Sequence, residues 1–154
     1  MAVEEPSMAQ HAKTKRRQMA DLQIELRSTD RQLGQLNWEL AQELVTLADQ
    51  ANDPAPLIQA VEALRSATRY YTFEDAPREH AMIQKAIADT LLSLGQKTGD
   101  RDALTTARDA YRGAITLASL LSDEELRESL RKSYKTTQTL LGDLPQNPSL
   151  FQVA

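Results

Sequence analysis

The stretch that decides the fold is AMIQKAIADTLLSLGQKTGDRDALTTARDAYRGAI, residues 81–115. Apolar residues recur in it at the three- and four-residue spacings of one helix face: Ile83, Ile87, Leu91 and Leu94, then Leu104, Ala107, Tyr111, Ala114 and, just beyond, Leu117. Gly99 separates the two series and suits the left-handed backbone conformation that ends a helix. We therefore predict two helices, at about 78–96 and 101–120.

A shift of 47 residues places the preceding part of the chain on this stretch. The matching pairs are Leu44 and Leu91, Leu47 and Leu94, Asp53 and Asp100, Leu57 and Leu104, Ala60 and Ala107, Leu64 and Tyr111, and Ala67 and Ala114. Repeats of this length are stacked units that bury their apolar faces against one another. The match predicts an earlier helix pair at about 30–51 and 55–71, and a closing helix at about 123–141.

These elements predict an all-α chain, because no stretch alternates with period two over a useful length. The helix starts share the same period, with Ser28, Asp75 and Ser122 in N-cap positions, and Ser122 forms a capping box with Glu125. The predicted organisation is a basic helical segment at 1–28, a repeat domain at 29–142 and a flexible tail at 143–154. The domain divides into repeats at about 29–75 and 76–121 and a closing helix at 122–142.

Small and aromatic positions in these repeats resemble the tetratricopeptide repeat, in a long-period variant common in bacterial arrays. The residues that carry the resemblance are Ile87-Ala88 and Leu91, then Ala107, Tyr111 and Ala114, and again Ala60, Leu64 and Ala67. The chain departs from the variant in having His80 for its opening Trp and Ala88 for its Gly. The resemblance covers residues 30–142 and implies a short right-handed solenoid whose concave groove binds a peptide or a partner helix.

Alanines mark the places where we expect helices to approach closely, because a bulky side chain there would overpack the interior. These alanines are Ala41, Ala60, Ala67, Ala88, Ala107 and Ala114. Tyr70, Tyr71 and Phe73 cluster where the two pairs meet, and we expect them to hold the pairs together.

The repeat register places six residues on one candidate groove surface: Trp38, Gln42, Lys85, Asp89, Lys132 and Thr136. An exposed aromatic flanked by polar groups is typical of a binding hot spot. The alternative is that Trp38, the only tryptophan, packs against the N-terminal helix as part of the core.

The composition argues against catalysis. The chain has no cysteine, so it offers no thiol nucleophile, thiolate zinc site or disulfide, and its two histidines lack metal-site spacing. We find no phosphate-binding loop and expect no enzyme activity, catalytic residue, metal or cofactor. Apolar runs are too short for a membrane span, and the first residues have no signal-peptide pattern, so we expect a cytoplasmic protein.

The first segment offers two further surfaces. The basic patch consists of Lys13, Lys15, Arg16 and Arg17, and we interpret it as a solvated arm or a contact for an acidic protein. We do not expect nucleic acid as a partner, because the whole chain carries a net charge of −4. From Met19 to Leu40 apolar residues follow a coiled-coil spacing for about three heptads. One continuous helix would then allow homodimerisation through residues 8–27. We favour a break near residue 28, where Thr29 and Gln32 offer cap chemistry, with the early helix folding back.

Together these features predict an adaptor or scaffold module that binds a partner peptide or helix in its groove. Two alternatives remain open at this stage. One is a small acidic chaperone that holds a client protein, and the other is a dimeric regulator that acts through the basic N-terminal helix.

Overall fold

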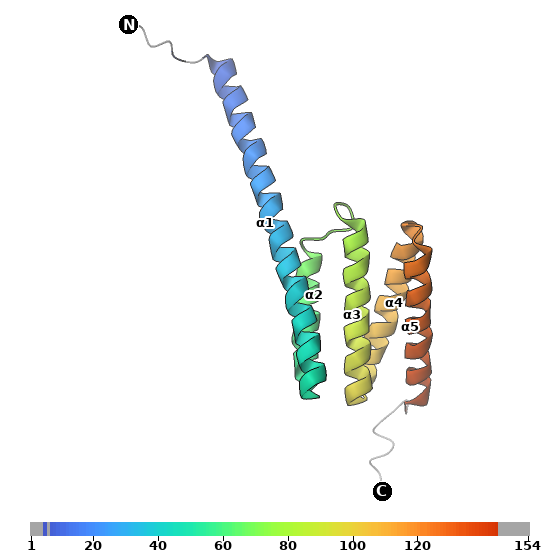
Figure 1. Ribbon diagram of the computed structural model, residues 1–154. Coiled ribbons are helices and arrows are strands. Elements are labelled where there is room, and N and C mark those ends of the chain that lie inside the picture. Colours follow the sequence, from blue (N-terminus) through green and yellow to red (C-terminus); the bar gives the residue numbers. More distant parts are fainter. Residues whose placement is uncertain (1–4, 6, 145–154) are drawn as a thin grey trace.

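The computed structural model describes residue 5 and residues 7–144, and this part of the chain is all-helical, with no strand. The five helices are α1 (Met8–Ala51), α2 (Ala55–Thr68), α3 (Pro77–Thr98), α4 (Arg101–Leu120) and α5 (Glu124–Asp143). Each helix packs on the next one along the chain, and α3 also contacts α5. In Figure 1, α1, α3 and α5 stand side by side, with α2 and α4 behind them.

The first helix is a single rod of 44 residues, so the predicted break near residue 28 is wrong. It begins at a capping box in which Ser7 and Gln10 satisfy each other's backbone N–H groups, and it ends at Asn52, whose φ is 49°. Thr29 does not cap a helix start, because its hydroxyl donates to the Glu25 carbonyl one turn earlier, at 3.0 Å. The helix therefore continues through residues 28–30 instead of folding back.

Gly34 is compatible with this continuous helix because the glycine has a packing role. A Cβ placed on Gly34 would lie 2.7 Å from Cε2 of Tyr71 and 2.9 Å from Cβ of Tyr70. The absence of a side chain thus lets the α1 backbone pass directly over these two tyrosines. The packing gained there offsets the propensity cost of about 1 kcal/mol that glycine imposes inside a helix.

Alanines line the contacts between helices, as predicted, and the structure adds two buried glycines, Gly34 and Gly95. All six expected alanines are at most 2% exposed. On α1 the small buried residues are Gly34, Ala41 and Ala48, and 47 residues later α3 buries Ala81, Ala88 and Gly95. The equivalent positions of the two pairs are therefore buried in the same way.

Beyond α1, the predicted boundaries shift by up to three residues, and the largest shift is at the end of α2, which stops at Thr68 instead of about 71. Gly99 ends α3 in the left-handed conformation, with φ 70°, as expected. The capping box of Ser122 and Glu125 is wrong: Ser122 has φ 54°, and Asp123 caps α5 by accepting a hydrogen bond from the Leu126 N–H. Ala76, not Asp75, precedes α3. Most of the predicted tail, 145–154, lies outside the described residues.

Candidate partner-binding surface

Trp38 lies half-buried on α1 and faces a depression of the surface. Its ring meets the Tyr71 ring edge to face, with centroids 6.2 Å apart and planes at 76°. The depression has a volume of about 360 Å³ and is lined by Gln35, Trp38, Glu39, Gln42 and Tyr71. Because α1 does not fold back, Trp38 packs on the α2–α3 connection rather than on an N-terminal helix. It therefore keeps one part in the interior and one part accessible to a ligand.

The α2–α3 connection holds Tyr71 in place from both sides. The Tyr71 hydroxyl donates to the Arg31 carbonyl on α1 at 3.5 Å, and the Tyr71 carbonyl accepts from Nδ1 of His80 on α3 at 2.8 Å. Since a carbonyl only accepts, His80 must carry its proton on Nδ1. Phe73 packs edge to face on the His80 ring, with centroids 6.2 Å apart. The expectation that Tyr70, Tyr71 and Phe73 hold the two pairs together is confirmed for Tyr71, which contacts both α1 and α3. Tyr70 lies against Gly34 of α1, and Phe73 lies against His80 of α3.

Lys85 and Asp89 form a pair one turn apart on α3. Lys85 Nζ lies 2.5 Å from Asp89 Oδ2, and the buried Tyr111 hydroxyl of α4 donates to Asp89 Oδ1, also at 2.5 Å. Burial, reinforced by the hydrogen bond with the Asp89 carboxylate, raises the pKa of Tyr111 well above its usual range. Asp89 is thus fixed by two internal partners while its side chain stays 41% exposed. A ligand approaching here meets a preorganised ion pair.

Lys132 and Thr136 are both exposed on α5. The Thr136 hydroxyl donates to the Lys132 carbonyl at 3.1 Å, a bond inside the helix that leaves the lysine ammonium free of any hydrogen bond or ion pair among the described residues. The six predicted groove residues therefore form three separate pairs, one on each of α1, α3 and α5. Among the described residues, no hydrogen bond or ion pair joins one pair to another.

Sequence reasoning missed three of the residues around Trp38: Gln35, Glu39 and Tyr71. Gln35 and Glu39 could have been found, because they lie three residues before and one residue after Trp38 and form a hydrogen bond with each other at 2.9 Å. Tyr71 could not be placed there from spacing, since it reaches Trp38 only through the α2–α3 connection.

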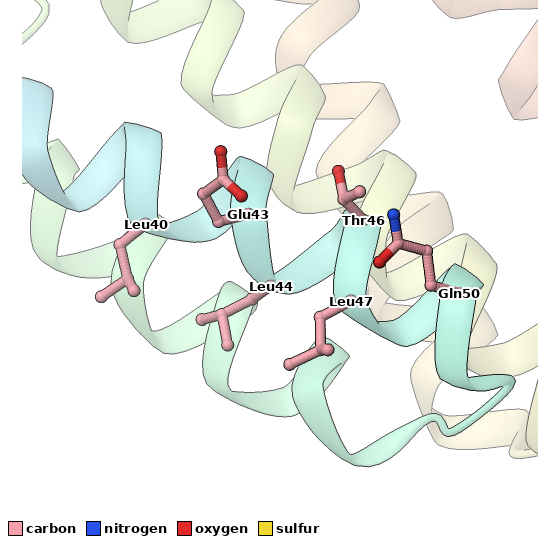
Figure 2. Close-up of a pocket in the computed structure, with 6 residues that line it drawn as sticks. All are labelled: Leu40, Glu43, Leu44, Thr46, Leu47 and Gln50. Carbon is pink, nitrogen blue, oxygen red and sulfur yellow. The ribbon is translucent and has the colours of Figure 1, made fainter.

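A second depression runs along α1 on the outside of the molecule. It has a volume of about 290 Å³ and is lined by Leu40, Glu43, Leu44, Thr46, Leu47 and Gln50. Figure 2 shows the three leucines projecting on the side where α2 runs and the three polar side chains on the other side. Leu40 and Leu47 are 52% and 50% exposed, so this depression presents apolar surface to solvent.

The basic patch, Lys13, Lys15, Arg16 and Arg17, lies on the part of α1 that projects beyond the other helices, and all four side chains are exposed. Among the described residues, three or more His, Asp or Glu side chains nowhere gather closely enough to hold a metal ion. Nor is any described helix both long and apolar enough to cross a membrane.

In comparisons with known proteins, no protein-family model, curated protein or solved structure matches the chain.

Proposed function

We propose that this chain is a protein-binding module, of the tetratricopeptide-like kind, that docks a peptide or helix of a partner on the surface of α1, α3 and α5. The observation that carries the proposal is the depression at Trp38, where the indole ring is accessible to solvent and is flanked by polar side chains. The module would act as an adaptor or scaffold in the cytoplasm, without catalysis, metal or cofactor.

Two further observations support this proposal. Buried small residues recur at equivalent positions of the two helix pairs, which is what stacked repeats require. The residues of the proposed surface also occupy equivalent positions of the 47-residue register, since Trp38 corresponds to Lys85 and Lys132, and Gln42 corresponds to Asp89 and Thr136. An elongated ligand crossing the three helices would meet one such pair on each.

The test is selection of peptide ligands from a random display library against the full chain, followed by titration of the selected peptides. Because Trp38 is the only tryptophan, its fluorescence reports binding at the depression directly. We expect bound peptides to shift this emission, and Lys85→Glu to weaken binding. Arg65→Glu is the control, because Arg65 is exposed on α2, a helix that carries none of the proposed surface. Binding that leaves the emission unchanged and tolerates Lys85→Glu would contradict the proposal.

The chaperone alternative differs in what it does to its ligand. A chaperone raises the solubility of a co-expressed client, whereas an adaptor leaves folded partners as they are. Trp38→Ala should then abolish the solubility gain if the same depression holds the client.

A further inference from the structure

The projecting half of α1, residues 8–29, carries apolar side chains that no other part of the described chain covers. Every residue from Met8 to Thr29 is exposed. Of the thirteen large apolar side chains exposed in the described residues, nine lie on α1. Eight of these nine belong to one series with alternating four- and three-residue steps, which we call the α1 stripe: Met8, Ala12, Lys15, Met19, Leu22, Leu26, Thr29, Leu33, Leu36, Leu40, Glu43 and Leu47.

The α1 stripe has the spacing of a two-stranded coiled coil over nearly six heptads. It runs from the projecting half onto the half that packs against α2, with charged side chains at only two positions, Lys15 and Glu43. It lies about a third of a turn from the buried small residues of α1. A helix docked on the stripe would therefore contact α1 along both halves without displacing α2.

The charges along α1 indicate which helix fits. Residues 8–20 contain four basic and no acidic side chains, whereas residues 32–51 contain three acidic and no basic ones. This order opposes the dipole of α1 itself, which favours acidic groups at the start and basic groups at the end. The first turn has no acidic residue and the last turn no basic residue. The distribution is complementary to an antiparallel copy of the same helix.

We propose that a second copy of this chain docks on the α1 stripe as an antiparallel coiled coil over residues 8–47. In this register, facing residues have numbers that add to 55, so Met8 faces Leu47, Met19 faces Leu36 and Leu22 faces Leu33 of the other copy. Every position of the stripe then has a partner. Each projecting half covers the exposed leucines on the packed half of the other copy, including the depression in Figure 2.

The two charged residues of the stripe fix both the direction and the register. In the antiparallel arrangement Lys15 of one copy lies one layer, about 4.5 Å along the axis, from Glu43 of the other. A parallel pair would instead place Lys15 against Lys15 and Glu43 against Glu43 in buried layers, which leaves like charges unpaired. The antiparallel register thus allows the two charged residues of the stripe to form an ion pair between the copies.

The first experiment is sedimentation velocity of the full chain at tens of micromolar, where we expect twice the 17.2 kDa of one chain. Leu22→Glu with Leu26→Glu should weaken self-association at least about a hundredfold, because the carboxylates would be buried in the interface. Both leucines lie where α1 contacts no other helix, so the rest of the fold is unaffected. Ile24→Glu is the matched control: Ile24 is 66% exposed between them but lies off the stripe, and the dimer should persist.

The second experiment tests whether the α1 helices of the two copies run antiparallel or parallel. A spin label on Thr14→Cys, in a chain without other cysteines, should give a distance of about 40 Å or more between copies, against under about 20 Å for a parallel pair. Lys15→Glu and Glu43→Lys should each weaken the dimer, and the double variant should restore it.

A monomeric wild-type chain, a short label distance, or a dimer that tolerates Leu22→Glu with Leu26→Glu would each overturn the proposal. So would a monomer that binds anionic vesicles through the stripe. None of these variants touches Trp38 or Lys85, so failure here is distinguishable from failure of the proposed ligand surface.

Discussion

The two halves of α1 have the same length and the same apolar stripe, yet only the second half packs against the rest of the chain. They differ in a series of positions seven residues apart. In the packed half these are Gly34, Ala41 and Ala48, all buried; in the projecting half they are Lys13, Ala20 and Arg27, all exposed. Small residues, not the leucines of the α1 stripe, thus distinguish the packed half of this helix from the projecting half. The leucines of the stripe stay exposed and available for another contact.

The largest expected difference between the halves is in hydrogen exchange. In the monomeric Leu22→Glu with Leu26→Glu variant, amides in residues 12–26 should exchange roughly a thousandfold faster than those in residues 38–48, because a helix without tertiary contacts opens locally. Exchange mass spectrometry resolves the two regions. In the wild-type chain at high concentration the difference should shrink. Equal protection in the monomeric variant would show that the projecting half has an intramolecular contact.

Enlarging a small residue should affect only the packed half. Ala41 is 2% exposed, and Ala41→Leu should cost about 1–3 kcal/mol in the free energy of unfolding, because its site has no room for the added atoms. Ala20→Leu, at the equivalent position of the projecting half, should change it by less than about 0.5 kcal/mol. Urea unfolding followed by circular dichroism gives both values. Similar costs for the two variants would contradict the division of α1.

Removing the aromatic contact of the packed half should have a smaller effect. Trp38→Leu loses the edge-to-face pair with Tyr71 and should cost about 0.5–1.5 kcal/mol beyond the change in buried area. A double-mutant cycle with Tyr71→Leu isolates this coupling. Ile24→Ala, one of the exposed positions of the projecting half, is the comparison and should leave the unfolding midpoint unchanged.

The smallest effect is expected at the junction between the halves. Thr29→Ala should stabilise the helix by a few tenths of a kcal/mol, because alanine has the higher helix propensity and the threonine hydroxyl bonds only within the helix. A threonine that capped a helix start would give the opposite sign, with a loss of about 1 kcal/mol. Amide exchange in residues 25–33 shows whether the substitution stabilises or destabilises the helix.

Periodicity predicted the helices well where apolar and small residues recur on one face, as in α3 and α4, and it predicted the burial of the alanines. It failed at residue 28 because Ser, Thr and Asp have two uses: they cap a helix start, or they bond one turn back inside a helix. Only the surroundings separate the two, and here the Thr29 hydroxyl bonds one turn back, to the Glu25 carbonyl, inside a continuous α1.

The candidate surface was predictable in part. The repeat interval selects Trp38 and its equivalents on α3 and α5. The fixation of Asp89 by Tyr111 depends on the distance between α3 and α4, and the approach of Tyr71 to Trp38 depends on the path of the α2–α3 connection. Neither distance is encoded in the spacing of a single helix.

The continuity of α1 also has a mechanical consequence. A helix without a hinge at residue 28 is a rod of about 66 Å that transmits orientation along its length. If two such rods lie antiparallel in the proposed register, the Trp38 positions of the two copies are held about 30 Å apart along the helix axis. Two weak sites at a fixed spacing bind a ligand with matching repeats far more tightly than either site alone. The 44-residue helix would then act as a molecular ruler that sets which bivalent ligands can bind.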